Sequence, residues 1–301
     1  MKRKNQLLIG LVAALALANL WVSNTGNRHQ GSFDPGLFKM DTSLIQSLEI
    51  KGASVDNRLL RLEEGWQLNR QYRVDRYFKR ILMSLLSSIN VKRKLSGAYM
   101  EDLKSESSDR VIAVNIMVGD ELRELKVLWN GTMTKTFFFE NGEGYEVGIP
   151  GYREFIGGIF RLTENQWRDR TLYSSTSYTL QEVAVSTNSV DFKINFDGQH
   201  FPEMEGNGKA DSRSLLNYLS QFEKLQVNER LSVGQFAVFD SLSKTKPFAR
   251  ISIRDITMKE PLEVQFFPKM EGQHYHLLAS SKGDLAVLDE KVVQSLLKPP
   301  S

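Results

Sequence analysis

The sequence predicts an α+β fold built from two tandem related units, each mostly antiparallel sheet with two helices, after an N-terminal transmembrane helix. Three observations predict this arrangement. Alternating apolar and polar residues recur between glycine turns, which is typical of antiparallel hairpins with one buried face. Two segments carry apolar residues at helical spacing. The order of these patterns repeats at an interval of about 136 to 140 residues.

The composition limits the classes of function. The chain of 301 residues is 41% hydrophobic and 25% charged, which is typical of a folded globular protein. It contains no cysteine, so disulfide scaffolds, cysteine-ligated metals, a cysteine nucleophile and a lipoprotein anchor are all excluded. The formal charge of +3 equals the charge of Lys2, Arg3 and Lys4, and the remainder is close to neutral. We therefore expect no nucleic-acid partner.

The N-terminus has the layout of a secretory signal or a membrane anchor. Three basic residues precede an apolar run of 16 residues, Leu7–Val22, that has one polar member. Cleavage after Ala18 would release the rest of the chain, and retention would leave a single-pass anchor; we favour the anchor. In both cases the basic cluster stays on the cytoplasmic side. We therefore expect the bulk of the chain to lie in the periplasm, held at the inner membrane.

A division into four parts is expected from these patterns. Polar, glycine-containing sequence follows the apolar run, and the segment around Glu164–Ser175 separates the two repeated patterns. The expected parts are a signal anchor at residues 1–26, a tether at 27–43, a first unit at 44–172 and a second unit at 173–301.

The clearest repeat is a pair of helices. The segment Val74–Ser96 aligns without gaps with Ala210–Ser232 at an offset of 136 residues. Each begins at an aspartate, Asp75 or Asp211, and then carries an apolar face at helical spacing. Aspartate before a helix accepts hydrogen bonds from the free N–H groups of the first turn. We therefore interpret both aspartates as helix caps and not as catalytic groups.

Strands surround each of these helices, and a second helix closes each unit. The closing helices are expected at Pro150–Phe160 and Asp289–Leu297, since proline and aspartate favour helix starts. The expected strands are Leu48–Ile50, Arg58–Leu62, Trp66–Leu68, Arg110–Ile116, Glu124–Trp129, Thr136–Glu140 and Glu146–Ile149 in the first unit, and Leu180–Val185, Val190–Phe196, Arg250–Arg254, Leu262–Phe267, Tyr275–Ala279 and Leu285–Leu288 in the second.

Several short motifs carry a resemblance to a known family. They are the N-terminal anchor, Ser47–Ile50, the Gly-Trp strand Gly65–Leu68, the Val74-Asp75 helix, the junction Trp167–Leu172 and the weaker second copy. With these features the chain resembles the bacterial domain-of-unknown-function family numbered 4340, a membrane-anchored group. The second copy departs from the pattern, with His200-Phe201-Pro202 in place of the Gly-Trp strand. The resemblance implies an auxiliary role in ABC transport or gliding motility, and it implies no catalytic motif.

Three motifs resemble catalytic or ligand-binding signatures, and each is incomplete. Ser241 and Lys244 match S-x-x-K, but the K-T-G partner motif is missing. Gly206–Lys209 resembles a phosphate loop without its first glycine or its Ser/Thr. His274 and His276 would share one strand face, with His200 as a distant third ligand. Exposed loops or a strand edge explain all three better, so we assign no catalytic, cofactor-binding or metal-ligating residue and expect no cofactor.

The remaining polar and aromatic clusters have simple structural explanations. The acidic pairs Glu63-Glu64 and Glu203/Glu205 fit solvated turns. Lys92–Lys94 with Arg80 could face anionic lipid or an acidic partner, but a solvated strand face is favoured. The run Phe137–Phe139 puts aromatic rings on both faces of a strand, which indicates either a covered sheet or a contact patch. Trp66 and Trp129 are expected in the core.

These observations lead to one favoured function and two alternatives. We expect a non-enzymatic, membrane-anchored accessory protein that binds a membrane partner, such as the permease of an ABC transport system. The alternative is a periplasmic module that binds a glycan, a lipid or a peptide. An envelope hydrolase is a third possibility, but it would require a convergent catalytic cluster that the sequence does not display.

Overall fold

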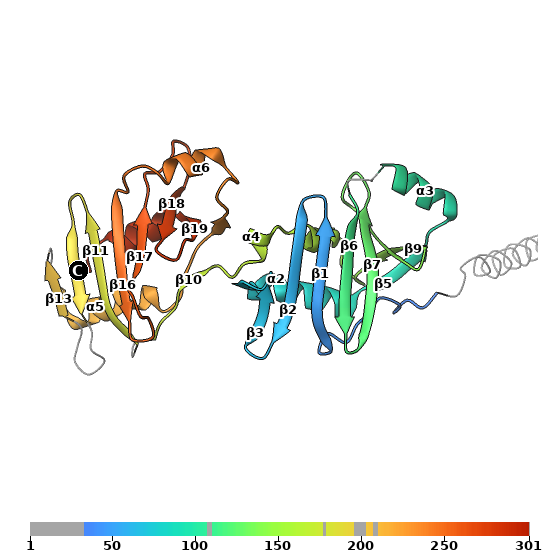
Figure 1. Ribbon diagram of the computed structural model, residues 1–301, viewed down its shortest axis with the longest axis horizontal. Helices are drawn as coiled ribbons and strands as arrows, with labels where there is room; N and C mark the ends of the chain where they lie inside the picture. The colour runs from blue at the N-terminus through green and yellow to red at the C-terminus, as the bar shows by residue number, and fades with distance from the viewer. Residues whose placement is uncertain (1–32, 107–109, 177–178, 196–202, 207–209, 301) are drawn as a thin grey trace, which may run out of the picture. The chain divides into compact units, whose positions relative to one another are not determined.

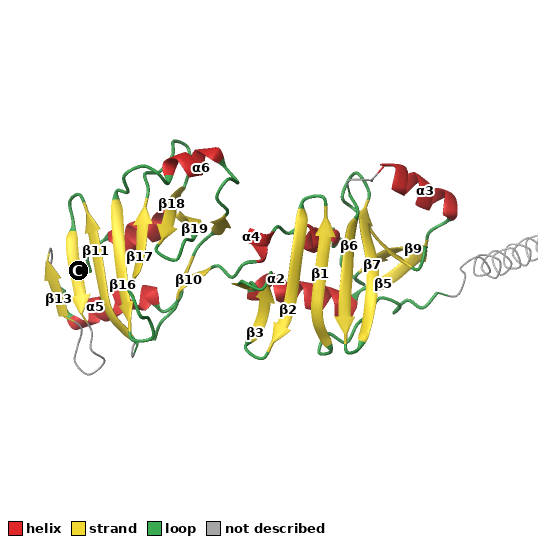
Figure 2. Cartoon of the chain, viewed as in Figure 1, coloured by secondary structure: helices red, strands yellow, loops and turns green. Residues whose placement is uncertain are grey.

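The computed structural model describes residues 33–106, 110–176, 179–195, 203–206 and 210–300. The chain divides into two compact units, Met1–Glu164 and Asn165–Ser301. Among the described residues every strand pair is antiparallel, and helices accompany both large sheets (Figure 2), so the α+β class is confirmed. The anchor expected at 1–26 lies outside the described residues, and no helix within them is long and apolar enough to span a membrane.

Unit 1 is built on a nine-stranded sheet with the order β4-β3-β2-β1-β6-β7-β8-β9-β5 (Figure 1). Strand β1, in the interior of the sheet, pairs with β2 on one side and β6 on the other, and Ile45, Leu48 and Ile50 are its buried apolar residues. The strands are β1 Ile45–Gly52, β2 Val55–Leu62, β3 Gly65–Leu68, β4 Tyr72–Arg73, β5 Asn90–Lys94, β6 Ile112–Val118, β7 Glu121–Trp129, β8 Thr136–Glu140 and β9 Glu143–Gly148.

The main helix of unit 1 is α2 (Arg76–Ser88), and it begins where the sequence predicts. The Asp75 carboxylate accepts hydrogen bonds from the N–H groups of Tyr77 (2.8 Å) and Phe78 (3.2 Å), which confirms its role as a cap. The apolar face of α2 is buried through Leu82, Leu85 and Leu86. The other helical segments are α3 (Gly97–Glu106), the short 3-10 helix η1 (Gly157–Arg161) and α4 (Glu164–Trp167) at the unit boundary.

Unit 2 contains an eight-stranded sheet with the order β13-β12-β11-β16-β17-β18-β19-β15, and a two-stranded sheet of β10 and β14. The strands are β10 Thr171–Tyr173, β11 Leu180–Thr187, β12 Asp191–Asn195, β13 Glu203–Gly206, β14 Leu225–Gln226, β15 Glu229–Leu231, β16 Ala249–Asp255, β17 Leu262–Phe266, β18 Tyr275–Ser280 and β19 Leu285–Asp289. The helical segments are α5 Ser212–Leu219, η2 Ser220–Phe222, α6 Ala237–Leu242 and α7 Glu290–Leu297.

Helices cover both faces of the unit 2 sheet. Apolar side chains of α5, η2 and α7 pack with the strands in one large core that includes Tyr218, Phe222 and Leu296. On the other face, Phe239 and Leu242 of α6 cover a smaller core. The sequence predicts α5 and α7 but not α6, which has no fully buried residue to mark it.

The two units share one topology, as the sequence repeat predicts. The unit 1 strands β3-β2-β1-β6-β7-β8-β9-β5 correspond, in this order, to β13-β12-β11-β16-β17-β18-β19-β15 of unit 2. These eight strands make up the whole second sheet. The central strands β1 and β11 have the same succession of buried and exposed residues. Both contain a β-bulge at a glutamine, Gln46 or Gln181, where the pairing register shifts by one residue. Buried side chains also match at the 136-residue offset, in the pairs Leu82/Tyr218, Leu86/Phe222 and Val91/Val227.

The prediction of a tether at 27–43 is wrong for residues 33–43, the part of it that the structure describes. Phe38 and Met40 are buried in unit 1, at 0% and 7% exposure. The segment 33–40 is the counterpart of the junction 168–175, since Asp34 and Asp169 each accept a hydrogen bond from the N–H two residues ahead (2.7 and 2.9 Å). The sequence does not reveal this, because the segment has no regular spacing of apolar residues and follows a polar, glycine-containing stretch that is typical of a linker.

The same correspondence moves the boundary between the units. The expected boundary lay between 172 and 173, whereas the chain divides after Glu164. The N–H groups of Val91 and Val227, one after each main helix, donate to the carbonyls of Pro35 and Arg170, both at 2.9 Å. Each unit therefore begins with the segment that leads into its first large-sheet strand, and 165–172 belongs to unit 2.

The prediction of a closing helix is also wrong for one of the two units, unit 1. Asp289 caps α7 as predicted, accepting from the Lys291 N–H at 2.8 Å. In place of a helix over 150–160, unit 1 has a turn and then the short η1. Gly151 adopts a φ of 77°, in the left-handed region, and Gly157 and Gly158 follow. Glycine at three positions disfavours a regular helix, which outweighs the proline start signal.

Replacing Phe38 by alanine tests whether this segment belongs to the core of unit 1. Truncating a fully buried phenylalanine is expected to lower the free energy of unfolding by about 3 to 5 kcal/mol, measured by urea denaturation of the full chain. Leu44→Ala is the control, because Leu44 is 53% exposed and its loss should change little. Equal effects of the two substitutions would contradict the burial of this segment.

Candidate functional site

The residues of the incomplete catalytic motifs do not form a site. Ser241 lies near the C-terminal end of α6 and Lys244 follows the helix, and both are exposed. Gly206 ends β13 with a φ of 99°, and residues 207–209 of the loop-like motif lie outside the described residues. The exposure expected at Ser241 and Lys244 is confirmed, although Ser241 lies on a short helix and not in a loop.

The two histidines of the candidate metal pair have different surroundings. His274 is exposed, whereas the Nδ1 atom of His276 lies 3.1 Å from the carbonyl oxygen of Phe267. The His276 ring also packs 5.1 Å from that of Phe248. Within the described ranges no group of three or more His, Asp or Glu residues could hold a metal, and His200 lies outside them.

The basic strand Lys92–Lys94 is largely neutralised by its neighbour β9. Arg93 Nε lies 2.8 Å from the Glu146 carboxylate, and Lys94 Nζ lies 2.6 Å from that of Glu143. The Lys94–Glu143 contact raises the pKa of Lys94 above its ordinary value. These pairs are typical of a solvated sheet edge, and they favour that interpretation over a free basic patch. The turn at Glu63-Glu64 and the strand with Glu203 and Glu205 are exposed.

The aromatic run on β8 is a covered sheet and not a contact patch. Phe138 is fully buried against Phe38 and Phe160, with ring centroids 5.2 and 5.9 Å away. Phe137 and Phe139 face the smaller core beneath α3, and both are buried. Trp129 is buried as predicted, and Trp66 is half-buried.

A different part of unit 2 presents apolar side chains to solvent. Val233 is 85% exposed, Phe236 45% and Val238 53%, all within six residues at the start of α6. We call these three residues the apolar loop surface. Behind it, Phe239 and Leu242 pack on a small core of strand residues, so the surface rests on a rigid base. Clustered exposed apolar side chains are typical of contact sites, whereas isolated ones are common on any protein surface.

Hydrogen bonds hold the loop in one conformation. The Gly234 N–H lies 3.0 Å from both carboxylate oxygens of Asp240, and Gly234 has a φ of 85°, which favours glycine. The Gln235 Oε1 atom accepts from the Ser232 N–H (3.1 Å) and from Asn165 Nδ2 (2.8 Å). Because the loop is already ordered, its binding to a partner would lose little conformational entropy.

A buried ion cluster fixes the segment that leads into unit 2. The Asp284 carboxylate contacts Arg168 Nη2 (2.8 Å) and Arg230 Nη1 (2.7 Å), and both arginines are 7% exposed. Arg230 also donates to the carbonyls of Asp169 (2.7 Å) and Thr171 (2.8 Å). Arg168 Nη1 donates to Asn165 Oδ1 at 3.3 Å, so the cluster continues into the hydrogen bonds of the loop.

A second buried polar contact holds the end of the same segment. The Tyr173 hydroxyl donates to the Asp255 carboxylate at 2.9 Å. Burial opposes ionisation of Asp255, but hydrogen bonds from Thr257 and Tyr173 outweigh it and hold its pKa below the ordinary value. Burial raises the pKa of Tyr173 well above its ordinary range. The pair is therefore a charged carboxylate held by neutral donors, which is a structural arrangement and not a proton relay.

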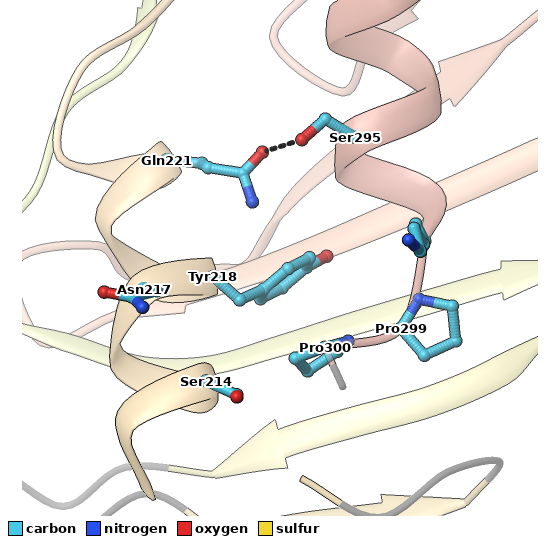
Figure 3. A pocket seen from close by; sticks show the side chains of 8 residues that line it. Ser214, Asn217, Tyr218, Gln221, Ser295, Pro299 and Pro300 are labelled. Carbon is cyan, nitrogen blue, oxygen red and sulfur yellow. Dashed lines mark hydrogen bonds between the residues drawn. The ribbon is translucent and has the colours of Figure 1, made fainter. Parts of the chain in front are cut away.

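The described residues also contain an open cleft of about 260 Å³ between α5 and α7 (Figure 3). At one end Ser295 donates to the Gln221 side chain at 2.7 Å. The Tyr218 ring extends from α5 toward α7 (Figure 3). Its hydroxyl donates to the Leu296 carbonyl at 2.6 Å. The lining residues are Ser214, Asn217, Tyr218, Gln221, Ser295, Lys298, Pro299 and Pro300.

Comparison of the chain with known protein families, curated proteins and solved structures found no match. The resemblance to the family numbered 4340 therefore stays an expectation from its motifs.

The apolar loop surface was not predicted from the sequence. Its signal is present in Ser232–Phe239, where a glycine turn interrupts apolar residues that continue neither a strand nor a long helix.

Removing the carboxylate of the ion cluster should destabilise unit 2. Asp284→Asn removes the charge of the carboxylate that contacts two buried arginines, and we expect a loss of about 3 kcal/mol in unfolding free energy by urea denaturation. Glu182→Gln is the control, because it breaks the solvent-exposed pair with Lys193 and should have little effect. A stable Asp284→Asn protein would show that the arginines need no counter-charge.

Asp255 should give a stability contribution that depends on pH. Its pKa is lowered in the folded state, so the contribution is complete above the unfolded pKa of about 3.9 and is lost as the pH falls through the lower folded value. We expect Asp255→Asn to have a lower Tm than the parent at pH 7, with a smaller difference below pH of about 4. A difference that stays constant with pH would argue against a charged Asp255.

Proposed function

We propose that this chain is a non-enzymatic, membrane-anchored extracytoplasmic accessory protein that binds a partner protein through the apolar loop surface. The observation that carries the proposal is the pinned loop with Val233 at its tip, 85% exposed. Burying exposed apolar area against another protein is favourable in proportion to the area removed from water. The cleft and the ion cluster supply no nucleophile with an adjacent base, which favours binding over catalysis.

The membrane attachment is supported by the N-terminal sequence. Basic residues at 2–4 and the apolar run Leu7–Val22 fit an anchor with its basic end in the cytoplasm. Only about ten residues separate this run from Phe33, the first residue that the structure describes. A partner that lies in or on the same membrane would therefore meet the chain at a high effective concentration. This favours a membrane protein as the partner, such as the permease of an ABC transport system.

Site-specific photocrosslinking tests the proposed surface in native membranes. A photoreactive amino acid at Val233 should form an adduct with a membrane protein, whereas one at Leu122, which is 50% exposed in unit 1, should not. Phe236→Ser combined with Val238→Ser should reduce the Val233 adduct at least several-fold, since both side chains flank the contact. Identical adducts from Val233 and Leu122 would contradict a specific surface.

The cleft between α5 and α7 supports the alternative of a ligand-binding module. Its volume of about 260 Å³ is below the usual range for drug-sized ligands, so it suits a small polar molecule or a short piece of a longer chain. Native mass spectrometry of the purified full chain would detect such a ligand. Asn217→Trp should abolish its binding by filling the cleft, and a ligand that stays bound in this variant would argue against the site.

A further inference from the structure

The first turns of α2 carry a concentrated positive charge. Arg76, Lys79 and Arg80 lie at spacings of three and four residues, which places them on one stripe of the helix. Arg73 lies just before them on the edge strand β4 and is exposed. We call these four residues the α2 basic cluster. The only acidic residue among positions 70–80 is Asp75, which is buried and caps the helix.

The α2 basic cluster is electrostatically unfavourable as it stands. In the described part of the chain none of its four members takes part in an ion pair, in contrast to Arg93 and Lys94 on β5. Cations near a helix N-terminus oppose the helix dipole, and like charges four residues apart repel each other. A bound anionic surface would relieve both effects.

The fold does not require these charges. The helix positions of the cluster correspond, 136 residues later, to Ser212, Leu215 and Leu216 in α5. That helix has the same capping aspartate and packs on its sheet in the same topology. Unit 2 therefore lacks a charge at these three helix positions, although Arg213 lies elsewhere on the first turn of α5. The stripe of three basic residues occurs in the unit that follows the expected anchor.

An exposed aromatic residue lies within the cluster. Tyr77 is 51% exposed, and the Arg80 guanidinium lies 5.9 Å from the centre of its ring. Arginine and lysine with an exposed tyrosine are the side chains that favour the headgroup region of a bilayer, where each basic residue contributes about 1 kcal/mol toward an anionic surface. The residues between Val22 and Phe33 span at most about 40 Å when extended, which keeps unit 1 within reach of the membrane.

We infer that the α2 basic cluster binds the anionic phospholipid surface of the membrane to which the chain is anchored. This inference rests on the proposed function, because the anchor supplies the proximity. It deepens that function by giving unit 1 a contact with the bilayer, while the apolar loop surface of unit 2 is left for the partner protein. The contact is electrostatic and should weaken as salt is raised.

Matched cysteine reporters test the inference, since the chain has no native cysteine. Ser84 is exposed on the same stripe as Arg76 and Arg80, and its counterpart in unit 2, Ser220, is also exposed. A polarity-sensitive fluorophore is attached to Ser84→Cys or Ser220→Cys in the full chain. Each labelled chain is placed in nanodiscs of phosphatidylcholine, with or without an equal part of phosphatidylglycerol.

We expect a blue shift at Ser84→Cys in the discs that contain phosphatidylglycerol, absent in the neutral discs and lost between about 0.1 M and 1 M salt. Ser220→Cys should not shift. Adding Arg76→Gln and Arg80→Gln should abolish the shift without lowering the Tm, because these substitutions remove charges that oppose the helix dipole. Lys92→Gln, on the neighbouring basic strand, should leave the shift unchanged.

Equal emission from Ser84→Cys in the two kinds of disc would overturn the inference. A shift in neutral discs on adding polyglutamate or an oligonucleotide, without a shift on phosphatidylglycerol, would also overturn it and would indicate a soluble acidic partner. Failure of the proposed anchor is seen separately, because the full chain would then not copurify with neutral discs. The reporter at Ser84 would still show whether the cluster binds anionic discs.

Discussion

Each unit depends on the segment that leads into its first large-sheet strand. An aspartate, Asp34 or Asp169, turns the chain, and an aromatic residue four positions later enters the core. A carbonyl of the same segment accepts the N–H of the buried valine that follows the main helix. Without this segment the core would lose a large aromatic side chain, and the N–H would lose its partner. In unit 2 the Arg230 and Asp284 cluster adds a second restraint on the same segment.

Much of the fold could be predicted from the sequence because its signals are periodic. Helix α2 and its cap at Asp75, the hairpins and the 136-residue repeat are all visible as patterns of apolar residues. The segment at 33–40, which together with its counterpart at 168–175 we call the entry segment, was missed because its buried residues follow no regular period. The apolar loop surface was missed for a related reason: exposure of Val233 depends on how Asp240 and Asn165 pin the loop, and tertiary contacts of this kind leave no periodic signal.

The two units use one scaffold for different surfaces. The two units share the capped main helix, the bulge in β1 or β11 and the turn at Asp34 or Asp169. The differences lie outside: a basic cluster at the start of α2 in unit 1, and an exposed apolar loop before α6 in unit 2. This distribution fits the proposal that the units have separate contacts, one with the membrane and one with a partner. Each proposed contact can therefore be tested with substitutions that leave the other in place.

The central claim is that the chain consists of two copies of one topology, each closed by its entry segment. The most direct measurement compares two fragments of unit 2, residues 165–301 and 173–301, by urea denaturation. The account predicts that 165–301 unfolds in one cooperative transition, whereas 173–301 lacks the turn at Asp169 and the contacts of Arg230 and is far less stable. Equal stability of the two fragments would contradict the account, because the turn at Asp169 and the carbonyls bound by Arg230 would then contribute nothing to the unit.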